Sequence, residues 1–226
     1  MIGIFDSGVG GLCAFREVRR LMPREDILYL ADRKNSPYGT KSKEEIIALT
    51  RADIQRLRSM GARKILIACC TASSIHDRLS DSEREIAMPI ITPAAKRAAA
   101  LGRKIAVIAT RHTAEGGFFS REIAKISDAM VTELAEQKLV SLVEGGSRDG
   151  RIGDECKREL KKIKNKVREI NADALILGCT HFSHLEGELS RLLPTVKIIS
   201  PAREGAVALV RSLNTCRVEG GRVTYM

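Results

Sequence analysis

Short apolar runs alternate with longer amphipathic stretches along most of the chain. Four of these runs are Ile2–Phe5, Lys64–Ala68, Lys104–Ile108 and Ala174–Leu177. Beyond their leading lysines and Gly3 they are apolar at consecutive positions, which is typical of strands that helices cover on both faces. Strands that alternate with helices indicate βαβ units. The pattern therefore predicts an α/β fold with mainly parallel sheets.

The two halves of the chain repeat this order of features. Ile105 follows Ile2 by 103 residues, and Cys179 follows Cys69 by 110. An apolar run ending in Cys-Cys-Thr in the first half thus has a counterpart ending in Cys-Thr in the second. Prolines interrupt the pattern near residue 90 and again near residue 200. We therefore expect two pseudo-symmetric α/β domains with the active site between them, the first formed by residues 1–91 and 200–226 and the second by residues 92–199.

Polar or small residues follow each of the four runs at once. The first run leads into a glycine-rich turn at residues 6–11, and the others lead into cysteines or threonines. Ligands of open α/β sheets bind just beyond the carboxyl ends of the strands, where such residues collect. We therefore expect Asp6 and Ser7 to face a binding site rather than fill a core. The segment Leu139–Val143 also reads as a strand, and the carboxylate of Glu144 follows it.

Two of the six cysteines, Cys69 and Cys179, stand where an apolar run ends and a helix is predicted to begin. A helix N-terminus carries partial positive charge, so we expect the pKa of these thiols to lie below the reference of roughly 8.5. Thr71 and Thr180 are predicted to cap the two helices. Each half then delivers one reactive thiol. The remaining cysteines outside the Cys-Cys pair are interpreted as small buried apolar side chains, namely Cys13, Cys156 and Cys216.

Other site chemistries fit these motifs less well. The glycine-rich turn lacks the dinucleotide fingerprint G-x-G-x-x-G, because Cys13 stands at its third glycine position, although its backbone N–H groups would suit an anion such as a carboxylate. Ligand types that suit zinc are present in Cys69, Cys70, Cys179, His181 and His184. Their spacing contains no C-x-x-C, and adjacent cysteines are expected to point in opposite directions, so no metal site is predicted. A disulfide between Cys69 and Cys70 would be strained.

Composition narrows the class of protein. The 226 residues are 44% hydrophobic and 29% charged, which is ordinary for a globular chain. No apolar run approaches the roughly 20 residues of a membrane span, and no signal-peptide pattern follows Met1, so we expect a cytoplasmic protein. Six cysteines are too few for a disulfide scaffold, which leaves the thiols reduced and free for chemistry.

The net charge of +10 raises the question of nucleic-acid binding. Much of the excess lies at residues 157–166, where Leu160, Ile163 and then Val167 recur at helical spacing, so the lysines there are expected to form the solvated face of a helix. Aromatic residues make up 4% of the chain and tryptophan is absent, which leaves few platforms for stacking bases. A nucleic-acid partner is therefore disfavoured, and a basic nucleic-acid-binding protein stays open as the non-enzymatic alternative.

Taken together, the motifs resemble those of the glutamate racemases, within the aspartate/glutamate racemase superfamily. The matching segments occur in the family's order and span nearly the whole chain, at residues 4–12, 37–41, 68–73 and 177–182. The resemblance implies two pseudo-symmetric α/β domains with the substrate between them. It also implies an enzyme that needs no cofactor or metal, interconverts L- and D-glutamate in the cytoplasm, and supplies D-glutamate for bacterial peptidoglycan.

The same resemblance implies a role for each site residue. Cys69 and Cys179 would be the two catalytic bases, acting on opposite faces of the substrate Cα. Asp6 and His181 would tune the proton transfers, and Glu144 would orient the histidine. The amino and carboxylate groups of the substrate would be held by Asp6, Ser7, Tyr38, Gly39, Cys70, Thr71, Thr110, Thr113, Thr180 and His181.

Two departures from the family pattern bear on substrate choice. Cys70 stands where the family commonly has an asparagine whose amide helps to hold the substrate, and a thiol is a weaker hydrogen-bonding group. Ser200 stands where the family usually has an acidic residue. A racemase of aspartate or of another acidic amino acid is therefore the alternative enzyme. The expected partner is glutamate as a small-molecule substrate, with a homodimer as the assembly that family members commonly form.

Overall fold

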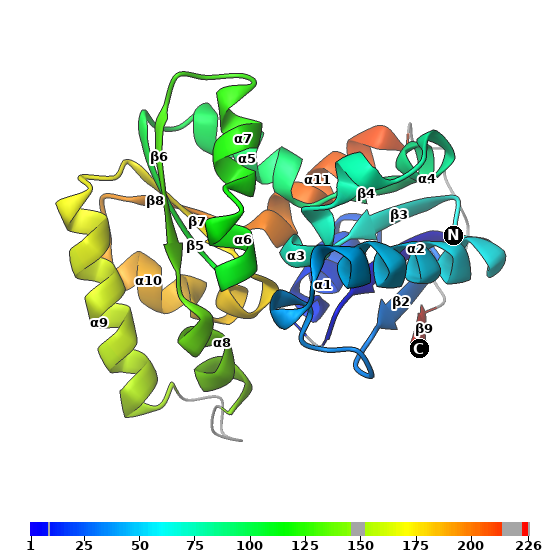
Figure 1. Cartoon of the computed structure of the whole chain (residues 1–226), viewed down its shortest axis with the longest axis horizontal. Coiled ribbons are helices and arrows are strands. Elements are labelled where there is room, and N and C mark those ends of the chain that lie inside the picture. Colours follow the sequence, from blue (N-terminus) through cyan, green and yellow to red (C-terminus); the bar gives the residue numbers. More distant parts are fainter. Residues whose placement is uncertain (9, 146–151, 214–222, 226) are drawn as a thin grey trace.

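Parallel strands form two sheets in the computed structural model, which describes residues 1–8, 10–145, 152–213 and 223–225. The first sheet has the order β4-β3-β1-β2-β9, and the second has the order β6-β5-β7-β8 (Figure 1). The first contains β1 (Ile2–Asp6), β2 (Ile27–Ala31), β3 (Lys64–Ile67), β4 (Ala87–Pro89) and β9 (Val223–Tyr225). The second contains β5 (Lys104–Ala109), β6 (Met130–Ala135), β7 (Ala174–Gly178) and β8 (Lys197–Ile199). The predicted α/β fold with parallel sheets is confirmed. We call each sheet with its helices the first half and the second half.

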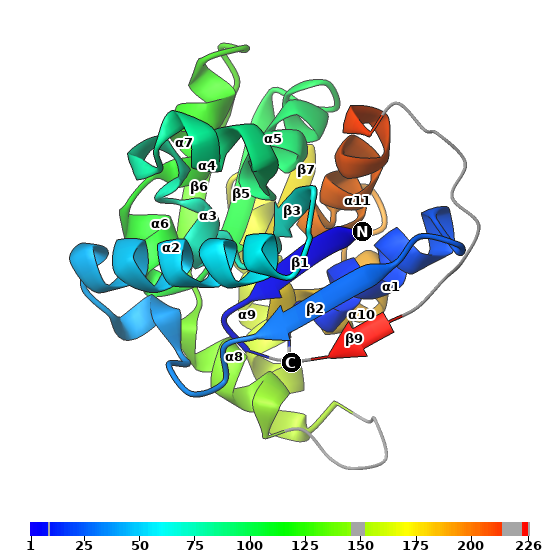
Figure 2. The same cartoon turned by 90° about the vertical axis from the view of Figure 1, so that its right-hand side faces the viewer.

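The four strands predicted from the apolar runs are β1, β3, β5 and β7. Each ends within one residue of its expected bound. From one edge to the other, the order β4-β3-β1-β2 corresponds to the order β8-β7-β5-β6, so the repeat in the sequence is a repeat of topology. Strand β9 extends the first sheet beyond β2, as Figure 2 shows. The bounds of two domains at residues 91/92 and 199/200 stay a prediction.

Helices cover the faces of both sheets. The first half carries α1 (Leu12–Leu21), α2 (Lys43–Ser59), α3 (Cys70–Ser73), α4 (Asp81–Ile86), α11 (Pro201–Ser212) and the short 3-10 helices η1 (Tyr38–Thr40) and η2 (His76–Arg78). The second half carries α5 (Ile91–Ala99), α6 (Arg111–Glu115), α7 (Phe118–Ala124), α8 (Gln137–Glu144), α9 (Asp154–Glu169), α10 (Glu186–Leu192) and the 3-10 helix η3 (Thr180–Leu185). Helix α11 packs against both α1 and α5, and so joins the two halves (Figure 1).

Local sequence explains where the long helices begin and which face they bury. A capping box starts α2, because the Ser42 side chain accepts from the backbone N–H of Glu45 while the Glu45 carboxylate accepts from that of Ser42. In α9, Leu160, Ile163 and Val167 are buried, which confirms the predicted amphipathic helix. The basic face of α9 carries ion pairs with acidic neighbours, among them Lys157–Asp154 at 3.0 Å, Lys162–Glu159 at 3.0 Å and Lys166–Glu136 at 2.7 Å.

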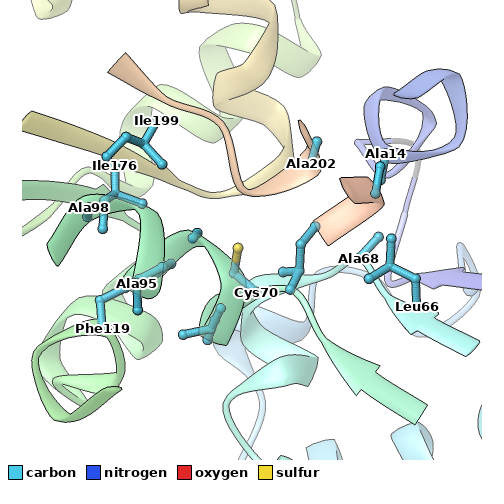
Figure 3. Packing of buried hydrophobic residues seen from close by; sticks show 14 of the residues in the cluster. Ala14, Leu66, Ala68, Cys70, Ala95, Ala98, Phe119, Ile176, Ile199 and Ala202 are labelled. Atoms are coloured by element: carbon cyan, nitrogen blue, oxygen red, sulfur yellow. The ribbon is translucent and has the colours of Figure 1, made fainter. Parts of the chain in front are cut away.

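One apolar cluster runs through both halves and fixes their relative position. It includes Leu66 of β3 and Ile176 of β7, together with residues of α5 and α11. Figure 3 shows these two strand residues on either side, with Ala202 and the sulfur of Cys70 between them. Burial of such aliphatic side chains stabilises the fold by about 1.5–3 kcal/mol each. The junction between the halves is therefore a packed apolar core.

The prediction of a strand at Leu139–Val143 was wrong, because this segment lies inside α8. Leu139 and Val140 are buried, and Leu142 and Val143 pack against the same apolar cluster, which makes a helical stripe. A short apolar run does not distinguish a helix from a strand by periodicity alone. Cys216, interpreted as a buried apolar side chain, lies outside the described residues. Within the described part of the chain, no helix combines the length and apolar character that a membrane span requires.

Candidate functional site

A small cavity lies where the carboxyl ends of the two sheets face each other. Its volume is about 30 Å³. The first half contributes Ser7, Ser36, Pro37, Tyr38, Gly39, Cys69, Cys70 and Thr71 to its lining. The second half contributes Thr110, Gln137, Val140, Glu144, Gly178, Cys179, Thr180 and His181. The two cysteines singled out by the sequence, Cys69 and Cys179, thus line one cavity from opposite halves, and they are 6% and 7% exposed.

A larger groove lies elsewhere, beside η2, β4, α5 and α7. It measures about 600 Å³ and carries charges of both signs, including Asp77, Lys96 and Arg121. Neither of the two cysteines lines it. Because perturbed titratable groups at the ends of parallel strands mark functional sites better than volume does, the smaller cavity is the candidate active site.

Cys69 sits at the end of β3 and begins α3 with its own side chain. Its Sγ accepts from the backbone N–H of Ala72 at 3.4 Å, so Cys69 is the N-cap and the expected cap by Thr71 was wrong. The hydroxyl of Ser7, at the end of the neighbouring strand β1, lies 3.1 Å from the same sulfur. Burial raises the pKa of Cys69 to about 11, and the charge of Asp6 adds to this. The predicted lowering by the helix N-terminus is therefore outweighed by loss of solvation.

Cys179 sits at the corresponding end of β7, and its surroundings include a titratable ring. Its Sγ lies 3.5 Å from Nδ1 of His181. The other ring nitrogen, Nε2, lies 3.0 Å from Oε1 of Glu144. Burial raises the pKa of the Cys179 thiol, so the lowering expected from a helix N-terminus was wrong here too. Thr180 is the first residue of η3 rather than its cap, and no side chain caps this 3-10 helix.

Asp6 lies behind the cavity rather than on its wall. Its side chain is fully buried and accepts from the backbone N–H of Gly8 at 3.0 Å and from the Thr180 hydroxyl at 3.4 Å. Burial raises the pKa of this carboxyl, which the Gly11 and Gly8 N–H groups, His181 and Thr180 partly oppose. The anion that the glycine-rich turn binds in this structure is thus a carboxylate of the chain itself.

Close packing requires two glycines of this turn, Gly10 where the halves meet and Gly11 within the first half. A Cβ at Gly10 would lie 2.4 Å from Oγ1 of Thr180, and a Cβ at Gly11 would lie 2.4 Å from Cβ of Asp6. Both distances are shorter than van der Waals contact allows. The turn therefore lets β1 of the first half approach η3 of the second half directly.

Three threonines join their hydroxyl groups across the two halves. Thr71 Oγ1 lies 3.3 Å from that of Thr110 and 3.5 Å from that of Thr113, and the Thr110 hydroxyl donates to Thr113 at 3.0 Å. Thr110 also caps α6, because its side chain accepts from the Thr113 backbone N–H. Thr71 and Thr110 line the cavity, whereas Thr113 is fully buried behind them.

Some residues that line the cavity were not predicted as site residues from the sequence. Ser36 and Pro37 adjoin the recognised Tyr38-Gly39 motif and line the cavity with it. Gln137 lines it too, and its Oε1 accepts from the Arg111 backbone N–H at 3.2 Å. Val140 lies in the segment that was predicted as a strand. Because this segment is a helix, the prediction did not place Val140 at the cavity.

The remaining cysteines differ from one another in their surroundings. Cys69 and Cys70 pack into different apolar clusters, which confirms that their side chains point apart. Cys156 is buried as interpreted, at 4% exposure. Cys13 is only partly buried, and its thiol donates to the Gly10 carbonyl at 3.0 Å rather than being an inert apolar group. Within the described residues, no group of three or more His, Cys, Asp or Glu side chains is arranged to hold a metal ion.

Comparison with known proteins identifies relatives over nearly the whole chain. The family model for Asp/Glu/Hydantoin racemase matches residues 14–209. A glutamate racemase of Gloeothece citriformis (strain PCC 7424) is 36% identical over 208 residues, covering 89% of this chain and 73% of the relative. One of Campylobacter curvus (strain 525.92) is also 36% identical, covering 99% of this chain and 88% of the relative.

Solved structures agree with the sequence relatives. The crystal structure of glutamate racemase from Francisella tularensis subsp. tularensis SCHU S4, in complex with D-glutamate, superposes with a TM-score of 0.89 at 28% identity. The match covers 99% of this chain and 86% of that one. Shared sequence, shared fold and the extent of both matches place this chain in the Asp/Glu/Hydantoin racemase family.

Proposed function

We propose that this chain is a glutamate racemase that inverts the Cα of its substrate with two cysteines and no cofactor. The observation that carries the proposal is that the buried side chains of Cys69 and Cys179, from opposite halves, line one small cavity. Inversion requires a proton to leave one face of Cα and a proton to arrive on the other. Two groups of the same kind on opposite sides of one carbon meet that requirement in both directions.

The proposed step conserves protons and charge. The thiolate of one cysteine removes the Cα proton and becomes a thiol, and the electron pair stays on the substrate as a carbanion. The thiol of the opposite cysteine then gives its proton to the other face and becomes the thiolate. The reverse reaction exchanges the two roles. Burial, which raises the pKa of both thiols, makes each thiolate a stronger base once it has formed.

Neighbouring groups supply the means to form the two thiolates. Nδ1 of His181 lies 3.5 Å from the Cys179 thiol and, in the tautomer that carries its proton on Nε2, accepts the thiol proton. Glu144 Oε1 lies 3.0 Å from Nε2 and places a carboxylate beside that side of the ring. On the other side, the Ser7 hydroxyl donates to the Cys69 thiolate. Asp6 lies behind Thr180, where its buried carboxyl accepts from the Thr180 hydroxyl at 3.4 Å and interacts electrostatically with His181.

We further propose that hydroxyl groups hold the substrate carboxylates. Thr71, Thr110 and Thr180 line the cavity. Thr71 and Thr110 exchange their mutual hydrogen bond, and Thr180 its bond to Asp6, for bonds to substrate oxygens. Donors aimed at the α-carboxylate stabilise the carbanion best in a site that excludes water. Ser7, Tyr38, Gly39 and Cys70 complete the wall of the first half. Thr113 acts by supporting Thr110.

Substrate entry requires the halves to separate. The cavity of about 30 Å³ has room for few water molecules and is small for a five-carbon amino acid. We therefore propose that residues 1–91 with 200–226 and residues 92–199 are two bodies that open to admit glutamate and close to exclude water. The small volume of the cavity supports this proposal.

The experiment for this proposal measures D-glutamate formed from L-glutamate by the purified chain without added cofactor, with L-aspartate as a parallel substrate. Racemisation of glutamate supports the proposal, and its absence contradicts it. Racemisation of aspartate alone would favour the alternative acidic amino acid, because Cys70 lines the cavity where the family commonly has asparagine. In the cell we propose a cytoplasmic role in supplying D-glutamate for peptidoglycan, and the oligomeric state, with a homodimer as the expectation, is read from the same preparation by light scattering.

A further inference from the structure

Three polar side chains meet behind the cavity wall formed by residues 36–39. Tyr38 is 1% exposed, and its ring packs against Phe5 with the ring centroids 6.1 Å apart. Its hydroxyl oxygen lies 2.7 Å from Oδ2 of Asp32 and 3.1 Å from Oδ2 of Asp53. Asp32 follows β2, whereas Asp53 lies in α2 and is 8% exposed. Two carboxyl groups thus share one buried phenolic hydroxyl.

Counting protons decides which carboxyl is ionised. A phenolic hydroxyl has one proton and donates to one acceptor. The contact with Asp32 is the shorter one, and the side-chain amide of Asn35 also donates to the Asp32 oxygens at 3.0 and 2.9 Å. Asp32 is therefore the acceptor of the Tyr38 proton. The remaining contact needs a proton on Asp53, since otherwise two sets of lone pairs would face each other in a buried place.

The charges around Asp53 agree with this count. Burial and the nearby charge of Asp32 raise the pKa of Asp53 to about 7, while the contact with the Tyr38 hydroxyl and the charge of Arg56 act in the opposite direction. Burial also raises the pKa of Tyr38, so the phenol keeps its proton. Asp53 therefore changes its protonation state near neutral pH.

We propose that Asp53 is a positioning residue, which in its protonated form donates to Tyr38 and thereby holds residues 36–39 against the second half. The segment packs directly on that half, because a Cβ at Gly39 would lie 3.3 Å from Cβ of Thr110. Loss of the Asp53 proton leaves two carboxylates around one phenol and loosens the segment. Its effect on catalysis rests on the proposed function: a loosened wall closes less tightly on the substrate, so KM rises with pH while kcat changes less.

The kinetic experiment compares Asp53→Asn and Asp53→Leu with the unchanged chain between pH 6 and pH 8. We expect KM for glutamate to rise about tenfold in the unchanged chain, the upper range for one lost hydrogen bond. Asp53→Asn keeps a donor at every pH, so its KM stays low and flat, whereas Asp53→Leu has a high KM throughout. Glu133→Gln is the matched control: Glu133 is also a carboxyl whose pKa burial raises, but it bonds to Ser120 away from the cavity. A flat KM in the unchanged chain, or a normal KM in Asp53→Leu, overturns the proposal.

A second experiment needs no activity. Trypsin sites at Lys34 and Lys41 flank the segment, and we expect cleavage there to increase from pH 6 to pH 8 in the unchanged chain relative to Asp53→Asn. Because the folded state holds the Asp53 proton above its usual pKa of 3.8, the Tm of the unchanged chain should fall relative to Asp53→Asn as pH rises from 3.8 to about 7, and then level off. No change in either difference overturns the proposal. If these differences appear but glutamate is not racemised, the proposed function fails and the positioning role of Asp53 stands.

Discussion

The two thiols occupy corresponding places in the two halves, yet their surroundings differ. Cys69 follows β3 and Cys179 follows β7, and these strands correspond in the two sheets. The Cys69 sulfur accepts from the Ala72 N–H at 3.4 Å and lies 3.1 Å from the Ser7 hydroxyl. The Cys179 sulfur instead lies 3.5 Å from Nδ1 of the His181 imidazole, which is a donor in one tautomer and an acceptor in the other. Because the topology is repeated, the two thiols occupy corresponding positions. The side chains near each thiol make their surroundings unequal.

The residues just after β1 and β5 show how the halves diverged. Ser7 follows β1 and contacts the thiol of its own half. Thr110 follows β5, caps α6 and joins the hydroxyl cluster with Thr71 instead. The equivalent position in the second half thus contacts the hydroxyl cluster, and His181 lies beside the thiol instead. The two sulfurs therefore occupy equivalent places in unequal environments.

Removing either sulfur gives the largest expected effect. Cys69→Ala and Cys179→Ala should each lower racemisation at least about 10³-fold, within the range for loss of a general acid or base. Each variant keeps one thiol, so each should still exchange the Cα proton of one enantiomer with solvent deuterium. The two variants should exchange opposite enantiomers, as proton NMR in deuterated water would show.

Both cysteine variants should fold, because each loses a small side chain at the edge of a cavity. Circular dichroism and a Tm close to that of the unchanged chain check this. Near-normal turnover in either variant, or exchange of the same enantiomer by both, would contradict the assignment of one thiol to each face.

Changing the partner of each thiol should have a smaller and unequal effect. His181→Asn removes a titratable group near Cys179, and we expect kcat to fall about 10-fold to 100-fold, the equivalent of a hydrogen bond to a charged group. Ser7→Ala removes a neutral donor from Cys69 and should lower kcat about 2-fold to 10-fold. Initial rates of L- and D-glutamate conversion measure both. Equal losses in the two variants would show that the environments are equivalent after all.

The sequence patterns predicted the strands and the positions of the two thiols, because both depend on the local order of residues. Apolar runs flanked by small polar residues define β3 and β7, and the cysteines follow directly. The environment of each thiol was not accessible in the same way. The pKa of Cys69 depends on burial, which comes from distant packing, and the sequence alone predicted its direction wrongly. The helix at Leu139–Val143 was not predicted, for a related reason. Its apolar stripe can be recognised only together with the neighbours that it packs against.

The glycine-rich turn shows the same limit. The backbone N–H groups of residues 6–11 were predicted to suit an anion. The structure shows that Gly10 is also needed for contact with Thr180 of the other half. A contact between segments so far apart in the chain leaves no local signal except the glycine itself. The contact between Gly10 and Thr180 also brings the surroundings of the two thiols together. A substitution at Gly10 therefore tests whether this contact links the two surroundings, without changing either thiol.

Gly10→Ala should weaken closure without removing any chemical group. Its Cβ would lie 2.4 Å from Thr180 Oγ1 and 3.1 Å from the His181 backbone nitrogen, so the halves must shift apart. We expect the free energy of unfolding to fall by about 1–3 kcal/mol, as for other overpacked sites, and KM to rise more than kcat falls. Gly187→Ala in α10 is the matched control, because a Cβ there would meet no described atom within 4 Å. Denaturant titration and steady-state kinetics measure both variants, and a Gly10→Ala chain as stable and active as Gly187→Ala would show that the turn does not hold the two thiol environments together.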